Sequence, residues 1–307
     1  MVEISIVVPL YRCDAFVTEL CMRLKETLTK ITESYEIILV NDQSPGNDWL
    51  EIQKECLIDN RIKGIHFSKN FGQHYAIIAG LEHSSGEWIV VMDGDLQDQP
   101  EEILKLYNRS KEGYEIVLAT RSQRRDSFFK KLGSKIFYKT LEYLTETKQN
   151  AEVANFGIYH RKTIDAVLQM NDKIKYFPTM IQWVGFRKSE ITVEHASRSE
   201  GKSSYNLFRL FSLAFNVILS FSDKPLRLTI QLGLTISLFS MIFALYTIYR
   251  SLMGEIHIIG YASLIVSVWF LSGIIITLIG IVGLYIGRTF EQVKNRPCYI
   301  VSNKINF

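Results

Sequence analysis

The sequence has few cysteines, and their spacing does not suggest a metal site. The four are Cys13, Cys21, Cys56 and Cys298, with no Cys-x-x-Cys pair among them. This pattern excludes a zinc-finger arrangement and favours reduced thiols in a cytosolic environment. The first residues, Met-Val-Glu-Ile-Ser, include neither a basic segment nor an apolar one, so we expect no cleaved signal peptide.

Two common phosphate-binding patterns and a strong charge bias are also missing. Neither GxGxxG nor GxxxxGK[ST] occurs in the chain, which excludes a dinucleotide fingerprint and a P-loop. The formal net charge is only +3, so global charge does not favour nucleic acid, and no nucleic-acid partner is expected.

Two long uncharged stretches stand near the C-terminus. Residues 228–249 contain no charged side chain, and the only ionisable groups in residues 256–287 are His257 and tyrosines. Each stretch exceeds the ~20 residues that cross a bilayer as a helix. We therefore predict two transmembrane helices, at about residues 228–249 and 259–287, within a segment 226–288. A pair of buried helices in a soluble protein is the less favoured alternative.

The charges that flank these stretches predict their orientation. The linker 250–255 is short, so the two helices should form a hairpin whose outer ends lie on one side. The basic residues at the outer ends are Lys224, Arg227, Arg288, Lys294, Arg296 and Lys304, against Arg250 in the linker. The positive-inside rule then places residues 1–205 and a tail, 289–307, in the cytoplasm of a multi-pass inner-membrane protein.

A shorter apolar segment precedes the hairpin. Residues 206–225 include LFRLFSLAFNVILSFS, which is too short to span a bilayer and contains Arg209. An amphipathic helix lying in the membrane interface fits this pattern, and a core helix of the preceding domain is the alternative.

The first 200 residues alternate strand-like and helical patterns. The predicted strands cover residues 4–9, 36–40, 62–67, 88–92 and 116–119, and the predicted helices cover 16–31, 49–57, 73–83 and 100–112. This alternation predicts βαβ units and an α/β domain with a mostly parallel sheet. Ligands of such sheets bind where the strands end.

Polar or aromatic residues follow four of these predicted strands, and the fourth is followed by DGDLQDQPEE. Asp93 and Asp95 offer the hard oxygen ligands that suit Mg²⁺ or Mn²⁺, and Gln97 could add a neutral oxygen. A surface turn or a helix cap is the alternative. Asp98, Glu101 and Glu102 are expected in the first turn of the next helix, where they favour its positive end.

The segments VVPLY, VNDQS, FSKNFGQHYAIIAGL and VMDGDLQDQPEEI, followed by the hairpin, resemble glycosyltransferase family two. Within that family the chain resembles the polyprenyl-phosphate glycosyltransferases, such as dolichol-phosphate mannose synthases and bactoprenol glucosyltransferases. The resemblance implies a GT-A (Rossmann-like) fold and transfer of a sugar from a nucleotide sugar to a polyprenyl phosphate. For a bacterial member it implies undecaprenyl phosphate as acceptor and a homotetramer.

The resemblance also assigns roles to residues. It implies nucleotide-sugar contacts for Pro9, Tyr11, Asp42, Asn70, Gly72 and Asp93, and a metal set of Asp93, Asp95 and Gln97. A structural turn remains the alternative for Tyr11, Asn70 and Gly72, and a helix cap for Asp42. The family usually continues VVPLY with Asn-Glu-Glu, where this chain has Arg12-Cys13-Asp14, and Gln43 replaces a glycine. The conformation of these two turns is therefore open.

Two basic segments are candidates for phosphate contacts. Residues 121–139 mix lysines and arginines with aromatics, and Arg121, Arg124 and Arg125 could meet the acceptor phosphate or anionic lipid headgroups. A solvated helix face is the alternative. Residues 198–205 resemble the family's Arg-x-x-Gly-x-Ser-Lys-Tyr loop over the diphosphate, which assigns Arg198 to the leaving group. Ser203 is assigned to the acceptor phosphate, and a surface loop without function is the alternative for the segment.

Asn155 stands where several relatives have an aspartate proposed as the base. It cannot accept a proton, but a phosphate monoester has its second pKa near ~6 and is mostly dianionic at pH 7. Asn155 could therefore orient an acceptor that needs no base, or serve only a backbone turn. We assign Asp95, Arg198 and Asn155 to catalysis of an inverting transfer.

Three other functions compete. A processive polysaccharide synthase normally has a Gln-x-x-Arg-Trp motif and more spans, whereas Trp183 here follows Gln182 directly. A membrane-tethered nucleotide-sugar-binding protein with a degenerate site would fit Asn155 and the altered first turn. A structural scaffold whose hairpin organises partners is the third alternative. UDP-glucose is the favoured donor; GDP-mannose, UDP-galactose, UDP-GlcNAc and UDP-linked amino sugars remain open.

Overall fold

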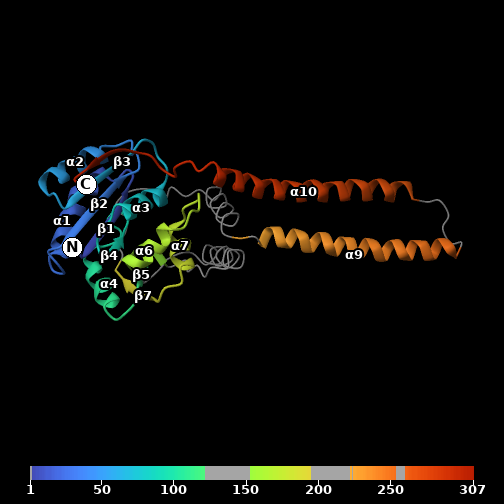
Figure 1. Cartoon of the computed structure of the whole chain (residues 1–307), viewed down its shortest axis with the longest axis horizontal. Coiled ribbons are helices and arrows are strands. Elements are labelled where there is room, and N and C mark those ends of the chain that lie inside the picture. The colour runs from blue at the N-terminus through green and yellow to red at the C-terminus, as the bar shows by residue number, and fades with distance from the viewer. Residues whose placement is uncertain (1, 122–152, 195–221, 223, 254–259) are drawn as a thin grey trace. The chain divides into compact units, whose positions relative to one another are not determined.

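The computed structural model describes residues 2–121, 153–194, 222, 224–253 and 260–307 (Figure 1). The described residues divide into two compact units. One contains residues 2–121 and 153–194 together with Arg296–Phe307, and the other contains the described residues between 222 and 295. The final segment of the chain therefore belongs to the unit that the N-terminus begins.

The first unit is built on an eight-stranded mixed sheet of order β7-β5-β6-β4-β1-β2-β3-β8. Its strands are β1 Ile4–Leu10, β2 Tyr35–Asn41, β3 Ile62–Phe67, β4 Trp88–Val91, β5 Ile116–Arg121, β6 Val153–His160, β7 Lys188–Val193 and β8 Val301–Ile305. The five strands predicted from the sequence are confirmed to within two residues. Strands β6 and β8 run antiparallel to their neighbours, so the sheet is more mixed than predicted.

Helices cover both faces of this sheet. One face carries η1 Asp14–Phe16, α1 Val17–Leu28, α2 Asp48–Ile58, η2 Pro100–Glu102 and α4 Ile103–Ser110, and the other carries α3 Gln73–Glu82, α6 Arg161–Leu168 and α7 Phe177–Trp183. Helix α1 shows why: Val17, Leu20, Cys21, Leu24 and Leu28 recur every three or four residues and are all buried. This spacing forms one apolar stripe, which packs on the sheet.

The central strands are buried on both sides. All seven residues of β1 and of β2 are buried, as expected for parallel strands between two helical layers. In β1, Ile4, Ile6, Val8 and Leu10 alternate into the core on the α1 face. Burying each such side chain stabilises the fold by roughly 1.5–3 kcal/mol. The sheet is thus a rigid base for the loops at its edges.

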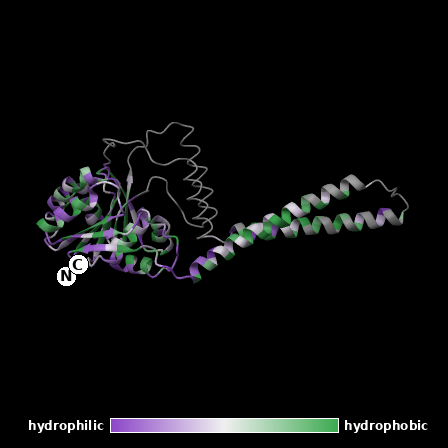
Figure 2. Ribbon diagram, turned by 90° about the horizontal axis from the view of Figure 1, so that it is seen from above, coloured by the Kyte–Doolittle hydropathy of each residue, from purple (hydrophilic) through white to green (hydrophobic). Residues whose placement is uncertain are grey.

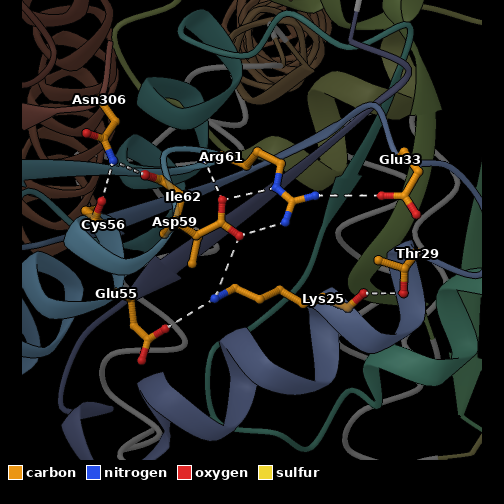
Figure 3. Close-up of polar contacts among 9 residues, drawn as sticks. All are labelled: Lys25, Thr29, Glu33, Glu55, Cys56, Asp59, Arg61, Ile62 and Asn306. Carbon is orange, nitrogen blue, oxygen red and sulfur yellow. Dashed lines mark hydrogen bonds and ion pairs between the residues drawn. The ribbon is translucent and has the colours of Figure 1, made fainter.

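Ion pairs hold the edge of the sheet where β3 begins (Figure 3). The Arg61 guanidinium donates two hydrogen bonds to the Asp59 carboxylate, at 3.1 and 2.9 Å. The Lys25 ammonium lies 3.9 Å from Asp59 and 3.7 Å from Glu55. Asn306, just beyond β8, donates from Nδ2 to the carbonyl oxygens of Cys56 and Ile62 at 2.7 and 2.8 Å.

The C-terminal segment differs from the simple tail expected for residues 289–307. Helix α10 continues to Val293, and residues Val301–Ile305 form β8, which pairs antiparallel with β3. The polar sequence VSNKI gave no strand signal, because β8 is an edge strand with three exposed residues. The cytoplasmic side of this segment stays a prediction.

The second unit contains two long helices, α9 Lys224–Leu252 and α10 Tyr261–Val293. They form where the two spans are predicted, and hydrophobic residues recur along both (Figure 2). Among the described residues one stretch, Phe270–Val293 in α10, is long and apolar enough to cross a membrane; α9 contains a shorter apolar stretch, Leu226–Ile236. The two-span hairpin stays a prediction, and the interfacial helix at 206–225 falls almost wholly outside the described residues.

Candidate functional site

Asp42 stands just beyond the end of β2, and its carboxylate organises the loop before α3. Its two oxygens accept hydrogen bonds from the backbone amides of Phe71 at 2.7 Å and Gly72 at 2.8 Å. Asn70 donates from Nδ2 to the Asp42 carbonyl oxygen at 3.1 Å. Three residues assigned to nucleotide-sugar binding, Asp42, Asn70 and Gly72, therefore lie together. Asp42 does not cap α2, whose N-cap is Asn47, so the capping alternative is wrong.

The backbone conformation at Gly72 makes this arrangement possible. Gly72 has φ +107°, a value that strains any residue with a Cβ, and it is the N-cap of α3. Burial raises the pKa of the Asp42 carboxyl, and the two amide hydrogen bonds act in the opposite direction. Neutral donors thus hold a buried acid at this edge.

The Asp-Gly-Asp turn follows β4 and contacts the same loop. Asp93 accepts a hydrogen bond at Oδ1 from Nε2 of Gln73, the first residue of α3, at 2.6 Å. A Cβ on Gly94 would lie 2.2 Å from Cδ2 of Leu10, so only glycine allows the turn to cross this close to β1. Segment 70–73 therefore holds both Asp42 and Asp93.

Asp95 completes the pair of carboxylates in this turn. Exposure alternates along residues 93–98. Asp93, Asp95 and Gln97 are partly exposed, and the residue after each of them, Gly94, Leu96 and Asp98, is buried. Oδ1 of Asp95 accepts a hydrogen bond from the backbone amide of Gln97 at 3.2 Å. The alternation of exposure continues beyond the end of β4 at Val91, through a turn in which Leu96 has φ +57°.

The two carboxylates fit a divalent ion only together with a ligand. Among the described residues, no group of three or more His, Cys, Asp or Glu side chains could hold a metal by itself. Mg²⁺ is commonly bound by one or two carboxylates plus substrate phosphates and water, which suits Asp93 and Asp95. The metal set, with Gln97, stays a prediction.

The acidic residues after the turn correct one expectation. Asp98 lies before the helix rather than in its first turn: it is buried, and Oδ2 accepts from the Asp93 amide at 3.4 Å. Glu101 and Glu102 do lie in η2, at the start of the α4 region. Asp98 therefore helps to shape the turn instead of stabilising a helix end.

The first loop shows how the unusual residues are accommodated. Pro9 is buried within β1, opposite Val40, and Tyr11 is 44% exposed beyond the strand end. Arg12 and Gln43 have φ +59° and +50°, in the left-handed region. Asparagine and glycine, which the family places at these two positions, adopt that region at lower cost. Arg12 and Gln43 therefore adopt the left-handed backbone conformation although neither is the asparagine or glycine of the family.

Asp48 is a buried carboxylate that sequence reasoning missed. Its oxygens accept from the Cys13 amide and the Ser44 hydroxyl, both at 2.7 Å, and the Ser44 Oγ accepts from the Arg12 amide at 2.9 Å. Asp48 thus ties the first loop to the second. Asp48 is the first residue of α2, where acidic residues are common, so no residue pattern predicted this contact.

The remaining predicted residues are described only in part. Asn155 is partly buried in β6, two residues before Gly157, which pairs with Val91 of β4. Because β6 runs antiparallel to β4, Asn155 lies at the edge where the Asp93 turn begins. Arg121 is the last residue of β5, at the same edge. Four predicted residues lie outside the described part of the chain: Arg124, Arg125, Arg198 and Ser203.

His74 is a second residue that the sequence did not single out. It follows Gln73 in α3, and its ring meets Tyr176 edge to face, with centroids 4.7 Å apart. Its Nδ1 atom is buried without a hydrogen-bond partner, and burial lowers the pKa of the imidazole to about 4. The ring is therefore neutral at physiological pH, next to the segment that holds Asp42 and Asp93.

Comparison with known proteins identifies the family. Residues 5–168 match the model of glycosyl transferase family 2. The chain is 36% identical over 301 residues to the uncharacterized glycosyltransferase YkcC of Bacillus subtilis, with 98% of this chain and 93% of that protein covered. It is 32% identical to the undecaprenyl-phosphate 4-deoxy-4-formamido-L-arabinose transferase of Shewanella sediminis, with 98% and 92% covered.

A solved structure supports the fold. Glucosyl-3-phosphoglycerate synthase from Mycobacterium tuberculosis, in complex with Mn²⁺, UDP and phosphoglyceric acid, superposes with a TM-score of 0.53. The match covers 71% of this chain and 76% of that one at 13% identity, so it supports a shared GT-A fold and nothing further. The chain belongs to glycosyltransferase family 2, and its relatives place it beside the polyprenyl-phosphate glycosyltransferases.

Proposed function

We propose that the protein transfers a sugar, with inversion, from a nucleotide sugar to a polyprenyl phosphate at the cytoplasmic face of the membrane. One observation carries the proposal: segment 70–73 holds both Asp42 and Asp93 at the carboxyl edge of the sheet. In a family 2 domain, this edge is where a donor would lie. The named relative that acts on undecaprenyl phosphate supports the same acceptor class.

The donor would be held by residues that follow the first four strands, together with Arg198. Asp42, Asn70 and Gly72 lie where a nucleoside would meet polar groups, with Tyr11 exposed beside them as a stacking surface. Asp93 and Asp95 would hold Mg²⁺ or Mn²⁺, which supplies charge neutralisation on the donor diphosphate. Arg198 would add a bidentate contact to the same phosphates as the bond to the sugar breaks.

The acceptor would react as a phosphate dianion. Its oxygen attacks the anomeric carbon while the bond from that carbon to the nucleoside diphosphate breaks, so no proton has to leave the acceptor. Asn155 would donate a hydrogen bond from Nδ2 to a phosphate oxygen and so orient the acceptor, which an amide can do without titrating. The basic side chains Arg121, Arg124 and Arg125, with Ser203, would meet the acceptor phosphate.

The topology of the chain supports a hairpin rather than a single span. Residues before α9 and residues after α10 belong to one folded unit, since Arg296–Phe307 adds β8 to the sheet that β1 begins. A chain that leaves and re-enters one folded unit crosses a bilayer an even number of times. If α10 spans through Phe270–Val293, we assign the second crossing to α9.

The donor sugar is tested by direct assay. We propose UDP-glucose as the first choice, with UDP-linked amino sugars next, because a relative is named for a formamido-arabinose. Membranes containing the full chain are incubated with undecaprenyl phosphate, Mg²⁺ or Mn²⁺ and a panel of radiolabelled nucleotide sugars. Label that enters the lipid fraction supports the proposal. Absence of transfer from every donor, while the protein binds UDP or GDP, would indicate a binding protein instead.

A further inference from the structure

The segment that returns from α10 packs against the loop that holds Asp42. Beyond the helix, residues 296–300 approach the carboxyl edge of β3, and the Ser68 amide donates to the Ile300 carbonyl oxygen at 3.0 Å. Lys173 donates from Nζ to the Arg296 carbonyl oxygen at 2.8 Å, which anchors the start of the segment. These contacts all lie within the first unit.

Tyr299 is the aromatic centre of this contact. Its ring stacks on Phe67, the last residue of β3, with centroids 5.0 Å apart and an interplanar angle of 21°. Its hydroxyl donates to the carboxylate of Glu82, the last residue of α3. One side chain therefore joins the returning segment to the end of β3 and to α3.

A chain of contacts leads from Tyr299 to the site. Phe67 is fully buried, and its ring meets Phe71 edge to face with centroids 5.5 Å apart. The backbone amide of Phe71 then donates to Asp42, beside that of Gly72. Phe71 and Tyr299 both pack on the buried cluster that contains Val40, two residues before Asp42.

We propose that Tyr299 is a positioning residue for the donor site. It holds Phe67 and Phe71 so that the amides of Phe71 and Gly72 meet the Asp42 carboxylate. The segment that follows α10 therefore contributes to donor binding through Phe67 and Phe71. This inference rests on the proposed function only in taking Asp42 as a donor-binding residue.

Substitutions at Tyr299 test whether its ring supports nucleotide binding. In the full-length protein, Tyr299→Ala should raise the Kd for UDP or GDP with Mn²⁺ by about 3- to 10-fold, the worth of one aromatic pair. The KM for the nucleotide sugar should rise likewise, with kcat and the acceptor KM within about twofold of wild type. Tyr299→Phe keeps the stacked ring and should bind as wild type does.

Asn306→Ala is the matched control for loss of stability. It removes two hydrogen bonds at the far end of β8 without touching Phe67. The thermal unfolding midpoint of each variant is measured beside its Kd. An equal rise in Kd for Asn306→Ala and Tyr299→Ala, or a wild-type Kd in folded Tyr299→Ala, overturns the proposal.

Hydrogen exchange keeps this test independent of the proposed function. In Tyr299→Ala, the backbone amide hydrogens of Phe71 and Gly72, measured in a peptide covering residues 68–76, should exchange at least about 10-fold faster than in the wild type. In Asn306→Ala they should exchange at the wild-type rate. A wild-type protein that binds neither nucleotide and transfers no sugar would contradict the proposed function alone. Equal exchange in the two variants would contradict the positioning role whatever the protein binds.

Discussion

Acidic side chains at the two edges of the sheet are held by different kinds of donors. At the edge where β2 and β4 end, Asp42 accepts from backbone amides and Asp93 from the amide of Gln73. At the edge where β3 begins, Asp59 is bound by Arg61 and lies near Lys25 (Figure 3). Asp42 therefore accepts from uncharged amides, whereas Asp59 is held by a cation.

The pKa values of two aspartates follow this difference. The hydrogen bonds from Arg61 lower the pKa of Asp59, whereas burial raises that of Asp42. The Asp59 carboxylate is neutralised by Arg61, whereas the Asp42 carboxylate accepts hydrogen bonds from uncharged amides. We therefore expect the edge with Asp42 to bind a ligand and the edge with Asp59 to stabilise the fold.

The largest expected effect is on catalysis at Asp95. Replacing it by asparagine removes a hard anionic ligand, so transfer of sugar to polyprenyl phosphate should fall by about 10²–10³-fold, typical of losing one group that stabilises developing charge. The thermal unfolding midpoint should stay near the wild-type value, since Asp95 is partly exposed. Initial rates with saturating Mn²⁺ measure this. Activity within twofold of wild type would remove Asp95 from the metal site.

Asp42→Asn should act on donor affinity. In the variant, the side-chain NH₂ group replaces one carboxylate oxygen and cannot accept a hydrogen bond. The backbone N–H of Phe71 or of Gly72 then loses its partner, at a cost of about 1–3 kcal/mol. We expect the KM for the nucleotide sugar to rise by about 10- to 100-fold, with a smaller change in kcat. Steady-state kinetics against Asn47→Ala, at a cap without a side-chain hydrogen bond, provide the comparison. Equal KM values in the two variants would contradict the donor role of Asp42.

The elements at the donor edge could be predicted because their signals are local. Alternating strand and helix patterns placed β1 to β5 within two residues, and the polar residues after each strand identified Asp42, Asp93 and Asp95 as neighbours. What the sequence did not show is how they are connected. The bonds from Phe71, Gly72 and Gln73 depend on the path of segment 70–73, which no residue pattern specifies.

Long-range pairings were missed for a related reason. Strand β8 is polar and short, and it pairs with β3 more than 230 residues earlier. Strand β6 was not predicted, because its antiparallel insertion between β4 and β5 breaks the βαβ alternation. In both cases the partner, and not the segment itself, determines the structure.

Two histidines differ in their surroundings in the same way, and one of them should make stability depend on pH. His160, at the edge where β4 begins, lies 3.8 Å from the Glu87 carboxylate, whereas the buried Nδ1 of His74 has no partner. Because burial lowers the pKa of His74 to about 4, the unfolded chain, with an ordinary pKa near 6.5, binds a proton that the native protein does not. The free energy of unfolding should therefore fall between pH 6.5 and 4, by about 2 kcal/mol at pH 5 relative to pH 7.

His74→Phe keeps an aromatic ring against Tyr176 and removes the titration. Urea unfolding from pH 5 to pH 7, followed by tryptophan fluorescence, should give the variant a flatter dependence on pH than the wild type. Parallel profiles for the two proteins would show that His74 is protonated as readily in the native state as in the unfolded chain.

The smallest expected effect is at the edge opposite the site. Asp59→Asn removes the anion that Arg61 and Lys25 share, and it should lower the free energy of unfolding by about 1 kcal/mol, because Arg61 is partly exposed. The sugar-transfer rate per folded molecule should not change, since Asp59 lies at the start of β3 and Asp42 follows the end of β2. Raising the salt concentration should reduce the difference from wild type. A loss of transfer comparable to that of Asp95→Asn would mean that the two edges do not divide binding from stability.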